Sequence, residues 1–100
     1  MNRQMLRQAQ QIQERLGRVQ EELEVATVEA TSGGGVVSVV VTGKQKVRSV
    51  KIDPEAVDPA EVELLEELVL AAINEGLQKS QELAEQKLGS ITGGLKIPGF

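Results

Sequence analysis

The first quarter of the chain carries an apolar heptad seam, in which hydrophobic residues recur at alternating spacings of four and three. The seam residues are Met5, Ala9, Ile12, Leu16, Val19, Leu23 and Ala26. This 3.5-residue period is typical of a helix that packs along a partner helix. The intervening positions are mostly Gln, Arg and Glu, which are good helix formers. The pattern predicts a helix over residues 2–24 that needs another helix beside it, because so narrow an apolar stripe is not stable alone in water.

Three segments rich in β-branched residues follow this helix, and turn residues separate them. Residues 25–31, 36–42 and 46–52 favour strands. The stretches Ser32-Gly33-Gly34-Gly35 and Thr42-Gly43-Lys44-Gln45 favour tight turns between them. The middle of the chain therefore predicts an antiparallel meander of three strands.

A second long helix is predicted over residues 59–88. Asp58-Pro59-Ala60-Glu61 combines an N-cap residue, a proline in the first turn and an early glutamate. Residues 62–73 are apolar around most of the helix circumference, which indicates burial on more than one side. The glycines and proline of residues 89–100 favour a flexible tail.

These elements predict an α+β fold of order α-β-β-β-α, with one domain over residues 1–88 and a tail over 89–100. Both helices are longer than a three-stranded sheet, so their free ends should project together as an arm, with Ile12 and Leu16 buried near Leu77 and Leu83. The apolar surface exceeds what one small subunit can bury, which predicts a homodimer. The residues expected in the core and dimer contact are Val37, Val39, Val41, Leu65, Val69 and Ile73.

Composition narrows the classes of function. The chain has no His, Cys, Trp or Tyr, and its one aromatic residue is Phe100. No disulfide, thiolate metal site or pair of nucleophile and base can be built, so we expect neither an enzyme nor a cofactor or small-molecule substrate. No apolar run suits a signal peptide or a membrane span, so we expect a cytoplasmic protein that is not bound to membranes.

Two further patterns have simple structural interpretations. Gly33-Gly34-Gly35 lacks the Lys-Ser/Thr pair and the helix of a phosphate-binding loop, so a hairpin turn is the preferred interpretation. The carboxylates of residues 53–67 lie between apolar positions and have no histidine nearby in the sequence. They are better explained as a solvated helix face than as a metal site.

The net charge is −4, but the charges are strongly sorted along the chain. Residues 53–75 hold eight acids and no base. The densest basic run, with no acid among residues 31–52, consists of Lys44, Lys46, Arg48 and Lys51. This run could contact phosphates, but regular alternation would put Arg48, Val50 and Ile52 on one face and Val47, Ser49 and Lys51 on the other. Because the charges then do not converge, protection of an edge strand is the preferred interpretation.

Four segments in the right order resemble the YbaB/EbfC family of bacterial nucleoid-associated proteins. They are MLRQAQQIQERL in the first helix, the V-x-I-D-P ending at Pro54, LVLAAINEGLQKSQE in the second helix, and the terminal GLKIPGF. The resemblance implies a dimer of this α-β-β-β-α order whose helical arms bind double-stranded DNA in the nucleoid, with effects on transcription. By position, it implies DNA contacts by Arg3, Gln4, Arg7, Gln8, Lys79 and Lys87. The Gly- and Lys-containing N-terminal extension of many family members is missing here.

Two functional hypotheses follow. From the residues alone, Arg3 and Arg7 are most simply a solvated helix face, whereas the resemblance favours phosphate contact by their guanidinium groups. The leading hypothesis is a homodimeric protein that binds duplex DNA with little base reading. The alternative is a coiled-coil module that binds other proteins without binding DNA, which the acidic stretch at 53–75 favours. A single aromatic residue, Phe100, is too few for a platform that stacks the bases of single strands.

Overall fold

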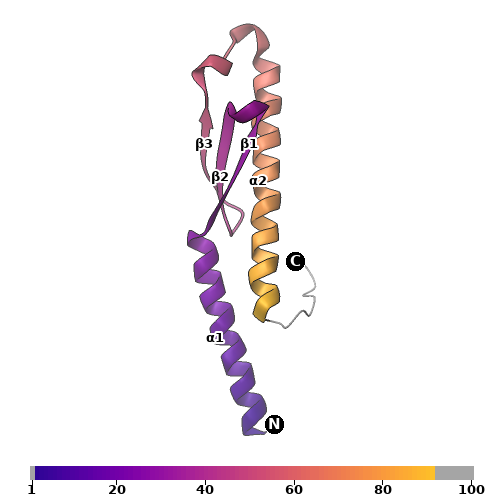
Figure 1. Ribbon diagram of the computed structural model, residues 1–100. Coiled ribbons are helices and arrows are strands. Elements are labelled where there is room, and N and C mark those ends of the chain that lie inside the picture. The colour runs from indigo at the N-terminus through magenta and orange to yellow at the C-terminus, as the bar shows by residue number, and fades with distance from the viewer. Residues whose placement is uncertain (1, 92–100) are drawn as a thin grey trace.

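The predicted order of elements is present in the computed structural model, which describes residues 2–91 (Figure 1). Helix α1 spans Arg3–Val25, strands β1, β2 and β3 span Thr27–Ser32, Val37–Thr42 and Val47–Ile52, and helix α2 spans Val62–Ile91. The strands form one antiparallel sheet in the order β1-β2-β3. The α+β class and the meander are thus confirmed. The molecule is 69 Å long with a radius of gyration of 18.7 Å, against about 13 Å for a compact domain of this length.

The helix boundaries follow from local capping. The Asn2 side chain accepts a hydrogen bond from the Met5 N–H at 2.8 Å, and α1 begins one residue later than predicted. The Asp58 side chain accepts from the Ala60 N–H at 2.9 Å, but residues 59–61 form a 3-10 turn before α2. Helix α2 continues to Ile91, three residues beyond the predicted end. The rest of the predicted tail, residues 92–100, lies outside the described residues.

The core lies between α2 and one face of the sheet. Val37, Val39 and Val41 of β2 are fully buried. Leu65 and Val69 of α2 are half-buried, and they pack against these valines together with the similarly half-buried Ile73. The three valines thus form the buried centre with the three α2 residues packed against it, and the predicted role of this set in a dimer contact stays a prediction.

Helix α2 approaches the sheet closely because a glycine faces the central strand. A Cβ atom added at Gly76 would lie 2.7 Å from Val41 Cγ2 and 3.0 Å from Val39 Cγ2, which is closer than packed carbons allow. By contrast, nothing lies within 4 Å of a Cβ atom added at Gly17, in the exposed middle of α1. One helical glycine is thus required by packing within the chain, and the other is not.

We therefore expect alanine at these two positions to change stability in opposite directions. Gly76→Ala overpacks the contact between helix and sheet and should destabilise the fold by about 1–3 kcal/mol despite alanine's better helix propensity. Gly17→Ala should stabilise it by up to about 1 kcal/mol. Urea unfolding of the two variants beside the parent measures both effects. A Gly76→Ala variant as stable as the parent would contradict the close packing.

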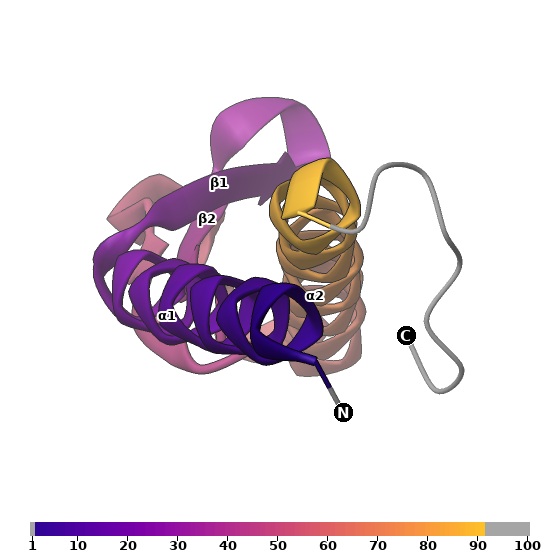
Figure 2. The same cartoon turned by 90° about the horizontal axis from the view of Figure 1, so that it is seen from below.

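The seam of α1 is mostly not covered by α2, contrary to the prediction. Leu23 is buried and Leu16 is half-buried, but Ile12 is 46% exposed, and Met5 is exposed as well. The reason is the position of α2 along the molecule. Most of α2 lies beside the sheet, so only its last turns are available to α1 (Figure 1). Residues 3–15 of α1 therefore extend past the end of α2, and we call them the projecting arm. Seen from below, α1 runs obliquely to α2 (Figure 2).

A β-bulge in β3 also changes the predicted strand faces. The register shifts between Val40 and Val41, so that Ser49 pairs with Val40 while Val47 pairs with Val41, leaving Arg48 as the extra residue. Cross-strand partners share a face of the sheet. The apolar residues of β3 therefore all lie on the α2 side, because each pairs with a buried valine of β2. We call Val47, Val50 and Ile52 the uncovered strip, since they remain 41%, 42% and 38% exposed.

Candidate nucleic-acid interface

Three of the four arginines of α1, Arg3, Arg7 and Arg18, lie on the half of the helix that faces away from the seam, while Arg15 lies closer to the seam. At about 100° per residue, Arg7, Arg18 and Arg15 are rotated by roughly 40°, 60° and 120° from Arg3, whereas the seam is centred near 200°. All four are exposed. Within the described residues, no hydrogen bond or ion pair engages their side chains. Their charges are therefore free to meet an external anion along roughly 22 Å of helix.

The glutamines assigned to the same surface lie beside these arginines. Gln4 and Gln8 are exposed near the free end of the projecting arm. An amide side chain can donate a hydrogen bond to a phosphate or meet a base edge. The arm tip thus offers two guanidinium groups and two amides on adjoining parts of one helix. No other helix or strand of the described chain lies beside that end of α1 (Figure 1).

The two lysines assigned to α2 occupy different environments. Lys79 Nζ donates to the backbone oxygen of Glu29 at 3.1 Å and lies 3.7 Å from a carboxylate oxygen of Glu75. Lys87 Nζ lies 3.2 Å from a carboxylate oxygen of Glu22. Glu22 is in the last turn of α1, roughly 22 Å along the helix from Arg7. Lys87 therefore lies far from Arg3 and Arg7, contrary to the prediction that the free ends of both helices project together, because α1 projects beyond the end of α2.

These ion pairs still allow Lys79 and Lys87 to contact an external anion. Both pairs are at the surface, where such contacts contribute about 0–1 kcal/mol and can be exchanged for another anion. Lys79 and Lys87 thus lie beside the body of the molecule as a site distinct from the arm tip. Arg3 and Arg7 remain the assigned cations with the fewest competing contacts.

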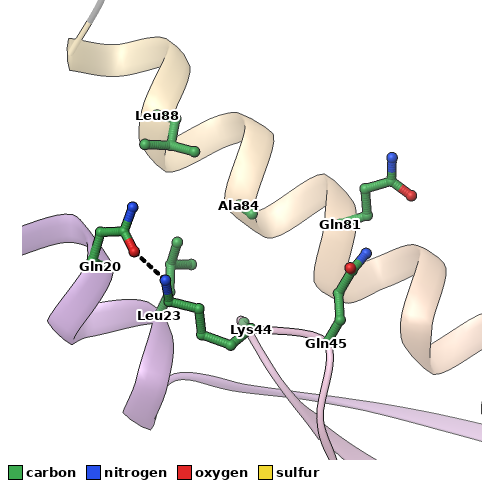
Figure 3. Close-up of a pocket in the computed structure, with 8 residues that line it drawn as sticks. Gln20, Leu23, Lys44, Gln45, Gln81, Ala84 and Leu88 are labelled. Atoms are coloured by element: carbon green, nitrogen blue, oxygen red, sulfur yellow. Dashed lines mark hydrogen bonds between the residues drawn. The ribbon is translucent and has the colours of Figure 1, made fainter. Parts of the chain in front are cut away.

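A groove lies at the junction of the C-terminal part of α1, the β2–β3 turn and α2 (Figure 3). It is lined by Gln20, Leu23, Gly43, Lys44, Gln45, Gln81, Ala84 and Leu88. The Gly43 N–H donates to the Ala26 oxygen at 2.9 Å, and a Cβ atom at Gly43 would lie 2.6 Å from Leu23 Cδ2. Lys44 Nζ donates to Gln20 Oε1. The glycine therefore allows the turn to rest directly on the base of α1.

The same turn is anchored from the other side by a buried serine of α2. Ser80 is fully buried, and its hydroxyl donates to the Thr42 oxygen at 2.6 Å. It also accepts from the Gln45 N–H at 3.1 Å, next to a left-handed Gln45 with φ of 61°. Sequence patterns predicted a turn here but not its contacts, since Ser80 looks like one more polar helix residue. The sequence feature that could have indicated these contacts is a small polar residue, Ser80, in the second helix of a chain whose β2–β3 turn contains a glycine.

Charge is distributed unevenly along the molecule. The acids of residues 53–75 lie in the connector and first half of α2, at the end of the molecule opposite the arm tip (Figure 1). The Asp53 and Asp58 side chains accept backbone hydrogen bonds in local turns. In the described residues, no cluster of acidic side chains could hold a metal ion, and no helix is long and apolar enough to cross a membrane. A long anion would thus be attracted to the arm and repelled by the opposite end.

Known proteins share this fold, and others are similar to this chain in sequence. A solved structure of an uncharacterized protein from Helicobacter pylori superposes with a TM-score of 0.79 over 93% of this chain and 99% of that chain, at 20% identity. A nucleoid-associated protein of Syntrophobacter fumaroxidans is 53% identical over 95% of this chain and 86% of its own length. One from Roseiflexus castenholzii is 48% identical over 98% of this chain and 97% of its own length. The YbaB/EbfC DNA-binding family matches residues 1–95. The chain therefore belongs to the YbaB/EbfC DNA-binding family.

Proposed function

We propose that this protein binds duplex DNA in the nucleoid as a homodimer, with low sequence specificity, and thereby influences gene expression. The observation that carries the proposal is the unpaired arginine face of the projecting arm, taken with membership of a DNA-binding family. Guanidinium groups suit the geometry of phosphate oxygens. The described residues offer few groups at the arm tip that could distinguish one base from another, so the phosphate backbone should supply most of the affinity.

The exposed apolar surfaces support the dimer. Leu68 and Lys79 lie on the side of α2 that is hydrogen-bonded to β1. Leu70, which is 60% exposed, and Ile73, which is half-buried, are rotated by about 120–180° from them and so lie on the side toward β3 and the uncovered strip. Within one subunit, α2 covers β1 and β2 but leaves β3 open to solvent on both faces. A second copy could cover this surface, because apolar area of this kind is unfavourable in water. The exposed start of the α1 seam gives a second region for contact between subunits.

An acidic residue at Leu70 should therefore dissociate the dimer without unfolding the subunit. Leu70→Asp places an unpaired charge in the contact and should raise the dimer dissociation constant by on the order of 100-fold. The neighbouring Ala71 is also exposed but is rotated by about 100° around the helix, away from β3. Ala71→Asp is thus the matched control and should remain dimeric. Sedimentation equilibrium measures both; a monomeric parent, or a dimeric Leu70→Asp variant, would contradict this contact.

Duplex binding measured at several salt concentrations is the test of the proposed function. A DNA-binding protein of this type should show a log–log salt dependence with a slope of about −0.9 per phosphate contact. Competing duplexes of unrelated sequence should bind within a few-fold of one another. No binding at low salt would favour the protein-interaction alternative, in which the exposed seam residues Met5, Ala9 and Ile12 pack against a helix of another protein.

A further inference from the structure

The outer face of the sheet, opposite α2, is a second polar and basic surface. Cross-strand pairing places Lys51, Ser38 and Thr31 in one row across the three strands. The neighbouring row consists of Ser49, Val40 and Glu29. No helix buries this face, since the β1 and β3 members of both rows are exposed and those of β2 are half-buried.

The bulge in β3 separates charge from apolar side chains. The three apolar residues of the uncovered strip lie on the inner face, while Lys51 lies on the outer one. Arg48 is the extra residue of the bulge, and Lys46 is in the turn just before the strand. Both are exposed. The regular alternation that would have scattered these charges among valines is therefore absent, because the bulge changes the register by one residue.

The side chains of Lys46, Arg48 and Lys51 have no hydrogen bond or ion pair within the part of the chain that the structure describes. Glu29, on the far strand, is the only acid that faces outward from the three strands. Lys44, the fourth member of the run, is held by Gln20 at the junction groove. The edge of the sheet thus carries three free positive charges beside a row of hydroxyl groups, the mixture of donors that contacts DNA phosphates.

We propose that Lys46, Arg48 and Lys51, with the hydroxyl groups of Ser38 and Thr31, form a second phosphate-contacting surface for duplex DNA. The proposal rests on the proposed function, because it assumes that the protein binds duplex. The arms and this surface are separated by the acidic last turns of α1, which hold Glu21, Glu22 and Glu24. DNA therefore meets two distinct basic regions in each subunit. Edge protection by lysine is the competing explanation for the same charges.

The test neutralises one region at a time. The sheet variant is Lys46→Gln, Arg48→Gln and Lys51→Gln, which removes three positive charges. The control variant is Ala71→Asp, Gln78→Glu and Gln86→Glu, at exposed positions of α2, which lowers the net charge equally but leaves the basic run intact. Affinity for a 30-base-pair duplex is measured over a range of salt concentrations, with sedimentation confirming the same oligomeric state throughout.

We expect the sheet variant to bind about tenfold or more weakly at 0.1 M salt and its salt slope to fall by about 2–3. The control should keep the parent's slope. If both variants bind alike while an Arg3 and Arg7 variant is impaired, the proposed function stands and the second surface is wrong. If the parent binds no duplex at any salt, the proposed function itself fails.

A second measurement uses only the parent protein, so it tests the proposal even if the sheet variant aggregates. Lysine acetylation of the parent, followed by mass spectrometry, should show Lys46 and Lys51 modified several-fold more slowly when saturating duplex is present. Both side chains are exposed and unpaired in the described structure, so bound DNA would be the cause of any protection. Unchanged acetylation of both lysines in a complex that has demonstrably formed would overturn the proposal.

Discussion

Replacing Val39 by aspartate should abolish the fold. Val39 is fully buried at the centre of the sheet, where it pairs with Ala30 and Val50 and faces Gly76 of α2. A carboxylate there would have no partner, and burying it costs more than about 4 kcal/mol whether it stays charged or takes up a proton. Domains of this size are stable by about 5–15 kcal/mol. Circular dichroism should show loss of the cooperative thermal transition, or its displacement by well over 15 °C.

The neighbouring residue of β2 provides the control for this variant. Ser38 lies on the outer face and pairs with Lys51 across the sheet. Ser38→Asp introduces the same charge into the same strand, but opposite a cation and in contact with water. It should cost no more than about 1 kcal/mol, mainly through the weak strand propensity of aspartate. Equal destabilisation by both substitutions would mean that the assignment of the two sheet faces is wrong.

Removing the arginines at the arm tip should weaken DNA binding and leave the fold intact. Arg3 and Arg7 are exposed, lie away from the seam and have no ion pair in the described residues. Alanine at both positions should reduce the salt slope by about 1 per lost contact and weaken binding to all duplexes by similar factors. Unfolding should be nearly unchanged, because alanine is a good helix former and no packing is lost.

Lysine at the same two positions distinguishes the contribution of positive charge to DNA affinity from that of guanidinium geometry. Arg3→Lys with Arg7→Lys keeps both positive charges but loses the two-pronged hydrogen bonding of guanidinium. We expect the parent's salt slope with a several-fold loss of affinity. Competition among duplexes of unrelated sequence should give similar ratios for the parent and for both double variants. Full affinity in the alanine variant at every salt concentration would exclude the arm tip as the DNA contact.

The candidate site could be predicted from the sequence only in part. The heptad phase places Arg3 and Arg7 away from the seam, whereas Gln8 adjoins it, and a DNA-binding role for Arg3, Gln4, Arg7 and Gln8 came only from the resemblance to the family. Lys79 and Lys87 were harder to place, since their neighbours come from the other end of the chain: Glu29 for one and Glu22 for the other. Periodicity contains no information on how far two helices overlap.

The sequence by itself determined the elements and their order. Heptad spacing, the Asp58-Pro59 start and the β-branched runs act within a few residues, so helix, strand and turn follow from local chemistry. Only the tertiary structure decided where α2 lies along the sheet, and hence that Ile12 is exposed rather than packed. It also decided the bulge at Arg48, which places Val47 beside Val50 and Ile52 instead of opposite them. Both features depend on contacts between residues that are distant in the sequence. Valines of β2 pack against Gly76 of α2, and Leu23 of α1 packs against Gly43 of the β2–β3 turn.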